Sequence, residues 1–189
     1  RGDDFRQILS TMNSLAKADA ARFILRDSLR VIRILEVLVS GKQTYIEAGS
    51  IHLLLYKLLG TNLSKMWHLQ VHSVDREAID ILNHTGSIYS PGDELTLSYI
   101  WGRKVSRREW QLGCAQSLIY SKIIRKEEMI NGNETFPHTR NEIEVIAAVK
   151  GLSTEACRTL FQQIRSLSSE EAAAVVQTYL KRQKITNLQ

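Results

Sequence analysis

The chain has 189 residues, of which 43% are hydrophobic and 24% charged, with a net charge of +5 and a pI near 9.3. This composition is typical of a compact folded protein, and the charge favours anionic partners but is mild beside that of dedicated nucleic-acid binders. The two cysteines, Cys114 and Cys157, exclude a disulfide framework and a cysteine-rich zinc site and favour a reducing compartment. There is no cleavable signal and no run of about 18 apolar residues, so we expect any membrane contact to be peripheral.

Helix signals run along the whole chain. Four hydroxyl residues precede an acid by three positions, a pattern in which side chain and backbone cap one another at a helix N-terminus: Ser90, Ser106, Thr139 and Ser168. We expect helices near residues 3–16, 18–39, 45–59, 62–71, 74–84, 91–104, 107–130, 140–150, 154–166 and 169–183. No alternating strand pattern competes with them, so the predicted fold class is all-α, a two-domain helical bundle.

One face of the predicted helix 18–39 carries four arginines: Arg22, Arg26, Arg30 and Arg33. At 100° per residue they fall within an arc of about 80°, and we call them the arginine stripe. The remaining faces predict burial of most of the helix circumference through Phe23, Ile24, Leu25, Leu29, Val31, Ile32, Ile34, Leu35, Val37 and Leu38. Arginine suits bidentate contact with phosphate, so the stripe is a candidate site for anionic lipid or RNA. The alternative is a solvated face that Asp19, Asp27 and Glu36 partly neutralise.

A second basic group lies at the expected joint between helices 91–104 and 107–130. It consists of Arg103, Lys104, Arg107 and Arg108, which we call the junction cluster. Trp101 and Trp110 lie close to it, and basic residues beside aromatic ones suit phosphate contact together with stacking or interfacial insertion. The alternative is that both tryptophans are core anchors and the charges are solvated.

The clearest break in the helical pattern is the polar segment 131–138. It predicts an N-terminal helical domain over 1–131, a linker over 132–138 and a C-terminal three-helix domain over 139–189. Such a small C-terminal domain gains stability by docking or oligomerising. Its core is predicted to contain Ile143, Ile146, Val149, Leu152, Leu160, Ile164, Leu167, Val175, Val176 and Leu180.

The sequence contains no recognisable constellation of catalytic residues. His68 and His72 have the spacing of two zinc ligands on a helix, but the acid expected between them is missing. Cys114 and Cys157 have no neighbouring histidine in the sequence to activate a thiol. His52 lies in an apolar run, which is typical of a core histidine. We therefore expect no enzyme activity, no bound metal and no cofactor.

The segment Leu95-Thr96-Leu97-Ser98-Tyr99, followed by Cys114 and by Leu118-Ile119-Tyr120, resembles a helical region of the orthomyxovirus matrix proteins. The resemblance implies an all-helical protein with an N-terminal domain, a linker and a smaller C-terminal domain. It also implies a protein that polymerises into a layer beneath an envelope, with anionic lipid on one side and viral ribonucleoprotein on the other. The junction cluster is the nearest counterpart of the family's basic segment, and no zinc ligands are carried over.

We therefore predict a viral matrix protein, a structural, self-associating scaffold that binds anionic phospholipid membrane and ribonucleoprotein through the arginine stripe and the junction cluster. Its expected location is the virion interior beneath the envelope and, in the host, the cytoplasm, the inner face of the membrane and the nucleus. The first alternative is a nucleocapsid-type protein that binds RNA directly. The second is a helical regulatory or enzyme domain whose charge is incidental. A flat basic patch favours lipid, whereas a cleft with stacking aromatics favours single-stranded RNA.

Overall fold

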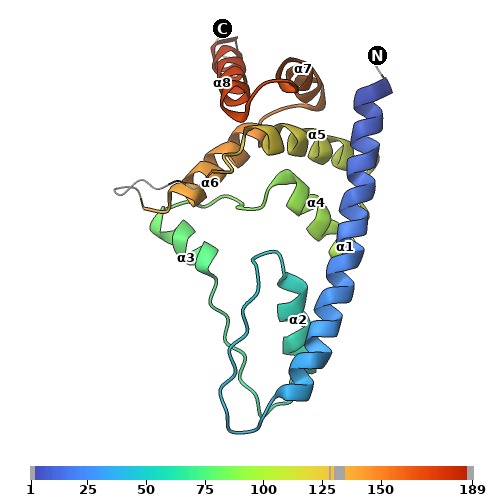
Figure 1. Cartoon of the computed structure of the whole chain (residues 1–189), viewed down its shortest axis with the longest axis vertical. Coiled ribbons are helices and arrows are strands. Elements are labelled where there is room, and N and C mark those ends of the chain that lie inside the picture. The colour runs from blue at the N-terminus through green and yellow to red at the C-terminus, as the bar shows by residue number, and fades with distance from the viewer. Residues whose placement is uncertain (1–2, 128, 130–134, 187–189) are drawn as a thin grey trace.

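The computed structural model describes residues 3–127, 129 and 135–186, and its regular structure is helical throughout (Figure 1). The helices in these residues are α1 (Asp3–Val37), α2 (Leu53–Asn62), α3 (Val74–Ile81), α4 (Pro91–Ile100), α5 (Arg107–Ile123), α6 (Pro137–Lys150), α7 (Thr154–Ile164) and α8 (Ser169–Thr186). No strand occurs within the described ranges. The predicted all-α class is confirmed.

Three of the four predicted capping residues begin helices. Ser106 forms a complete capping box, in which its hydroxyl accepts from the Glu109 backbone N–H and the Glu109 carboxylate accepts from the Ser106 N–H. The same side-chain acceptance begins α4 at Ser90, and Ser168 makes both reciprocal bonds before α8. The fourth, Thr139, is wrong because α6 already begins at Pro137. A proline fits the first helical position, where no backbone N–H donor is needed.

Several predicted helices differ from the structure: the expected helix 45–59 begins only at Leu53, and the expected helix 107–130 ends at Ile123. The expected break near residue 17 is absent and α1 runs for 35 residues, since Ala16, Lys17 and Ala18 are all good helix formers. The expected helix 62–71 is absent, and residues 65–73 have no helical structure. A helix there would carry an apolar face of Leu63, Met66, Trp67 and Val71. Met66 and Val71 are exposed, and only Leu63 and Leu69 pack against a core cluster, so the fold offers that face no partner.

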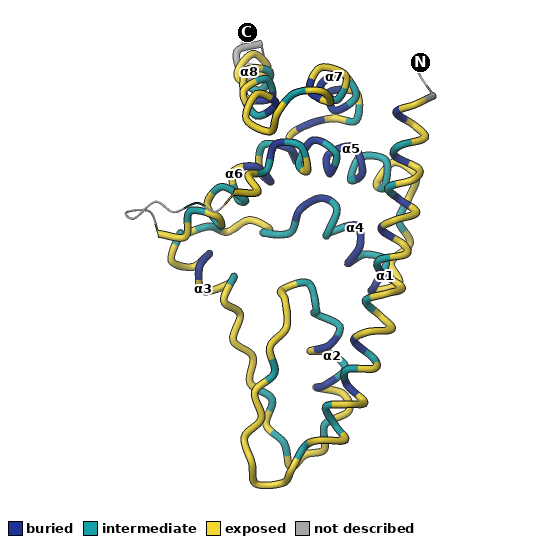
Figure 2. Tube along the Cα trace, in the orientation of Figure 1, coloured by how far each residue is buried: buried dark blue, intermediate teal, exposed yellow. Residues whose placement is uncertain are grey.

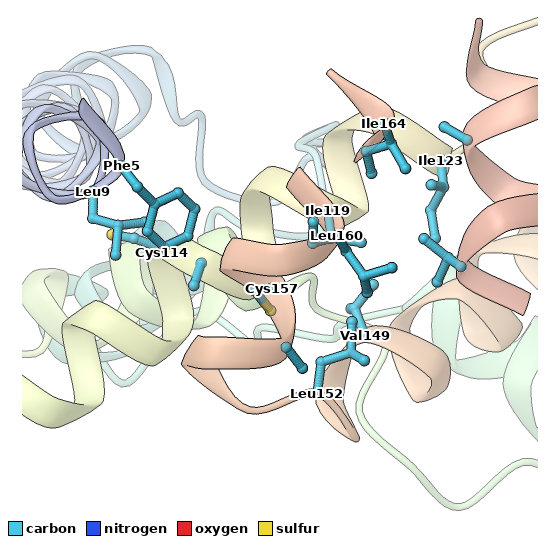
Figure 3. Packing of buried hydrophobic residues seen from close by; sticks show 14 of the residues in the cluster. Phe5, Leu9, Cys114, Ile119, Ile123, Val149, Leu152, Cys157, Leu160 and Ile164 are labelled. Carbon is cyan, nitrogen blue, oxygen red and sulfur yellow. The ribbon is translucent and has the colours of Figure 1, made fainter. Parts of the chain in front are cut away.

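The main core surrounds α5. Phe5 and Leu9 of α1 pack near Cys114 at one end, and α7 covers the middle of α5 with Leu160 near Ile119 (Figure 3). Six of the ten predicted C-terminal core residues are buried: Ile146, Val149, Leu152, Leu160, Ile164 and Val176. This one cluster joins α1 and α5 to α6, α7 and α8, so the two predicted domains share a core. The predicted linker 132–138 lies partly outside the described residues, and Pro137 and His138 belong to α6.

The C-terminal half of α1 extends beyond this core and packs with α2. We call this region, together with residues 38–52 and 63–73, the arm. Its core cluster is small and consists of Val31, Leu55 and Leu59. Figure 2 shows that the two irregular segments of the arm are exposed along most of their length. The arm therefore presents both α1 and its loops to solvent.

Candidate functional site

The four side chains of the arginine stripe have different partners. Arg22 forms an ion pair with Asp19 at 2.9 Å, and Arg33 forms one with Glu36 at the same distance. Arg26 is exposed and has no hydrogen-bond or ion-pair partner among the described residues. Two of the four charges are therefore already matched by an acid on α1, as the alternative interpretation of a solvated face expects.

Arg30 is half-buried and belongs to a polar contact between α1 and α2. Asp27 is 1% exposed, and its Oδ1 accepts a hydrogen bond from His52 Nδ1 at 2.6 Å. Its Oδ2 accepts from the Leu55 backbone N–H at 3.2 Å, which satisfies a free donor in the first turn of α2. Arg30 Nη1 lies 3.5 Å from His52 Nε2. His52 is thus a largely buried histidine, as predicted, and Arg30 is turned toward it.

The apolar residues of the α1 C-terminal half are less buried than predicted. Leu25, Leu29 and Ile32 are 61%, 53% and 54% exposed, and Val37 is exposed as well. The reason is that α2 covers α1 on one side, where Val31 packs against Leu55 and Leu59, while nothing in the described chain covers the opposite side. We call Leu25, Leu29 and Ile32 the apolar row.

An acidic cleft borders the N-terminal end of the arginine stripe. It has a volume of about 390 Å³, and Arg22 and Phe23 line it together with four carboxylate residues, Asp19, Asp75, Asp93 and Glu142. Burial, followed by the charges of Asp75 and Asp93, raises the pKa of Tyr89 in the same cleft. The negative charge repels anions from this end of the stripe.

The junction cluster has fewer internal partners than the stripe. All four of its side chains are exposed, and Arg103 pairs with Glu109 at 2.9 Å. The other three, Lys104, Arg107 and Arg108, have no hydrogen-bond or ion-pair partner in the part of the chain that the structure describes. Arg107 and Arg108 also occupy the first turn of α5, where the helix dipole adds partial positive charge.

The tryptophans beside the junction cluster have different roles. Trp110 packs against the main core, as the alternative interpretation expects. Trp101 is 42% exposed, and Lys57 of α2 lies over its ring with Nζ 4.9 Å from the centroid. Lys57 therefore adds a fifth basic residue to this surface, a contact that no local sequence pattern indicated.

A groove between α4 and α5 adjoins the junction cluster. Its volume is about 540 Å³, and it is lined in part by Leu95, Leu97, Trp101, Val105 and Leu112, with Arg103 among its polar lining residues. Glu94 and Glu109 also line the groove, and Glu109 pairs with Arg103, so the unpaired positive charge of the junction cluster lies beside the groove and not within it.

The structure does not bring together the candidate residues for metal or thiol chemistry. His68 and His72 lie on the irregular segment 63–73, so their spacing does not place them on one helix face. No group of three or more potential ligands suited to a metal ion occurs among the described residues. Burial raises the pKa of the Cys114 thiol to about 11 and that of Cys157 to about 12, so both remain protonated near neutral pH.

The two basic clusters lie on different elements. The stripe follows α1 into the arm, and the junction cluster lies between α4 and α5, with no hydrogen bond, ion pair or ring contact between them among the described residues. No described helix has both the length and the apolar character needed to cross a bilayer. Sequence reasoning found both clusters but missed the Asp27–His52 contact. The sequence did contain one signal for this contact: Asp27 is an acid on the same face of α1 as the apolar Val31.

Comparison with known proteins finds a distant relative. The chain is 26% identical over 166 residues to an uncharacterized protein of Archaeoglobus fulgidus. The match covers 86% of this chain and 55% of the relative, so the chain spans about half the length of that protein. No family model matches the sequence, and no solved structure matches it.

Proposed function

We propose that the protein is a non-enzymatic structural protein that binds anionic phospholipid surfaces peripherally through the junction cluster. The observation that carries this proposal is the exposed, unpaired state of Lys104, Arg107 and Arg108 beside the first turn of α5. Each basic residue close to an anionic leaflet contributes about 1 kcal/mol to binding. The stripe is the weaker candidate because Arg22 and Arg33 are paired and the acidic cleft adjoins Arg22.

The groove between α4 and α5 supports lipid as the anion. A phospholipid needs positive charge for its headgroup and apolar surface for its glycerol and acyl region. The apolar lining of the groove, which includes Leu95 and Leu112, supplies the second. The unpaired Lys104, Arg107 and Arg108 beside it supply the first, since Arg103 in the groove is paired with Glu109. Membership of the orthomyxovirus matrix class, with a location beneath a viral envelope, remains a proposal that rests on the sequence resemblance alone.

Vesicle flotation tests the proposal. Vesicles that contain phosphatidylserine should recruit the protein, neutral vesicles should not, and added salt should weaken binding because exposed charges are screened. Replacing Arg103, Lys104, Arg107 and Arg108 with Gln should weaken binding by about tenfold or more. The matched control replaces four exposed bases from other surfaces with Gln, which gives the same change in net charge: Arg6, Lys65, Arg140 and Lys181.

The control variant should bind nearly as well as the wild-type protein. Equal losses in the two variants would mean that net charge, and not the junction cluster, governs binding. Equal recruitment to neutral and anionic vesicles would contradict the proposal altogether.

Single-stranded RNA is a second candidate partner for the same surface. The observation that favours it is the exposed ring of Trp101 beside Lys57 and Arg103, because an aromatic side chain next to bases can stack a nucleobase. Replacing Trp101 with Leu separates the candidates, because Leu keeps apolar surface in the groove but cannot stack a base. It should reduce RNA affinity by about 1–3 kcal/mol if a base stacks there, whereas vesicle binding should change much less.

A further inference from the structure

The acidic cleft holds more negative charge than the chain neutralises. Four carboxylates, which come from α1, α3, α4 and α6 (Figure 1), and one guanidinium line it, so its net charge is −3. Arg22 is already paired with Asp19. The carboxylates of Asp75, Asp93 and Glu142 are half-buried and have no ion-pair partner among the described residues. Like charges around one cleft repel one another, so a cation bound between them would be stabilised.

Thr96 gives an independent reason to expect a ligand in this cleft. It lies on α4, lines the cleft and is only 7% exposed. Its hydroxyl makes no hydrogen bond within the described residues, whereas the hydroxyl of Ser98 on the same helix donates to the Glu94 carbonyl oxygen. The Thr96 oxygen is not fully enclosed by protein atoms, so it opens into the cleft. A buried hydroxyl without a partner costs free energy that a bound hydrogen-bond donor recovers.

The carboxylates suit an extended cation better than a metal ion. No three potential ligands in the described ranges form a group that could hold a metal. Burial, followed by the charges of Asp75 and Asp93, raises the pKa of Tyr89. Burial, followed by the hydrogen bond and charge of Glu142 and the charge of Asp93, raises the pKa of Tyr120. Asp93 therefore acts at both tyrosines and the other two acids at one each, so the negative charge is spread along the cleft.

Apolar side chains line the cleft together with the acids. Phe23, Ile51 and Ile88 provide surface that methylene groups can contact. The Phe23 ring already has the Arg22 guanidinium 5.7 Å from its centroid, so the carboxylates and not this ring are the sites open to a cation. The volume of about 390 Å³ lies within the range of small-molecule pockets, roughly 300–1,000 Å³. This size favours a free small molecule over a segment of protein.

We propose that the acidic cleft is a binding site for an aliphatic polyamine, a methylene chain that carries two or more ammonium groups. The ammonium groups donate to Asp75, Asp93 and Glu142, and the Thr96 hydroxyl accepts from the same chain. The apolar lining contacts the methylene groups. This site is separate from the junction cluster, which attracts anions, so the two proposals can fail independently.

Isothermal titration calorimetry with spermidine tests the site. The wild-type protein should bind one spermidine per chain and saturate. Putrescine has one ammonium group fewer and should bind about tenfold more weakly, because one charge-assisted hydrogen bond is lost. Mg²⁺ at the same concentration should not displace spermidine, because the described residues contain no group of acids suited to a metal.

The D75N/E142Q variant removes two of the carboxylates and keeps the shapes of the side chains. Its affinity for spermidine should fall at least about tenfold, because two hydrogen bonds to charged groups are weakened. The matched control is E127Q/E170Q, which makes the same change in net charge at exposed positions that do not line the cleft. The control should bind spermidine as the wild-type protein does, and circular dichroism should show that both variants are folded.

Thr96→Val tests the hydroxyl that has no partner. Valine has nearly the same shape, and the hydroxyl makes no hydrogen bond within the described chain, so thermal unfolding should show no loss of stability. The affinity for spermidine should nevertheless fall by about two- to tenfold, the effect of losing one hydrogen bond.

Absence of saturable spermidine binding, or equal losses in D75N/E142Q and its control, would overturn the proposal. So would a folded Thr96→Val variant with the affinity of the wild-type protein, or displacement of spermidine by equimolar Mg²⁺. Binding of an oligolysine peptide without binding of spermidine would assign the cleft to a basic segment of a protein partner and would also overturn it.

Discussion

Asp27 is the residue on which the attachment of α2 to α1 depends most directly. Its two carboxylate oxygens accept from His52 and from the Leu55 backbone, and it is almost fully buried. In Asp27→Asn one of these two acceptors becomes a donor, so one N–H group loses its partner. We expect the free energy of unfolding to fall by about 1–3 kcal/mol, measured by chemical denaturation.

Asp19→Asn is the control for this change. Asp19 is a more exposed acid on the same helix and pairs with Arg22, and an exposed pair of this kind contributes about 0–1 kcal/mol. If the Asp27→Asn variant were as stable as the Asp19→Asn variant, the buried contact would not hold the arm together.

Ser106 is a helix-capping residue of α5, and the same sequence pattern wrongly assigned this role to Thr139. Ser106→Ala removes the acceptor for the Glu109 N–H at the start of α5 and should lower the free energy of unfolding by about 1 kcal/mol. Thr139→Ala should cost less, because Thr139 lies inside α6 and caps no helix end. Thermal unfolding of both variants measures the difference, and equal losses would contradict the assignment of Ser106 as the cap.

The sequence predicted helix starts well where the determining interactions involve only neighbouring residues. Hydroxyl residues followed by acids located the starts of α4, α5 and α8 because capping involves only neighbouring residues. The absent helix 62–71 shows the limit of this reasoning. Its backbone state depends on what the segment packs against, and packing partners from distant parts of the chain leave no local signal.

The apolar row illustrates the same limit within α1. The pattern of Leu25, Leu29 and Ile32 predicts a face that becomes buried, and the sequence does not say by what. Within the described chain, α2 and its neighbours cover only the opposite side of α1. Periodicity therefore predicted the helix and its apolar character correctly, but not the exposure of this face.

At the scale of the whole molecule, the sequence predicted where the two basic clusters lie but not which of them is the better anion-binding site. Charge and spacing identified Arg22 and Arg107 equally well. Their difference arises from tertiary structure, because the fold sets the acidic cleft beside Arg22 and brings Lys57 to Trp101 near the junction cluster. Long-range placement of charge decides which cluster attracts an anion.

The shared core predicts how the two halves of the chain depend on each other. More than half of the buried residues in the main cluster come from the second predicted domain: Val145, Val149, Leu152, Ala156, Cys157, Leu160, Ile164, Ala172 and Val176. A fragment of residues 1–131 would expose Ile119 and Ile123 of α5 to water, and each fully buried side chain of this size contributes about 1.5–3 kcal/mol. Because whole domains are stable by only about 5–15 kcal/mol, we expect this fragment to lack cooperative unfolding in calorimetry.

Cleavage without removal is the control for this truncation. A protease site introduced at residues 131–134 would cut the chain between α5 and α6 while leaving α6, α7 and α8 packed on α5. The cleaved protein should keep a cooperative transition, because the apolar contacts of Leu160 and Val149 with the α5 side of the core do not need the covalent connection. A fragment of residues 1–131 that unfolds cooperatively at the midpoint of the full chain would instead establish the two independent domains that the polar segment 131–138 predicted.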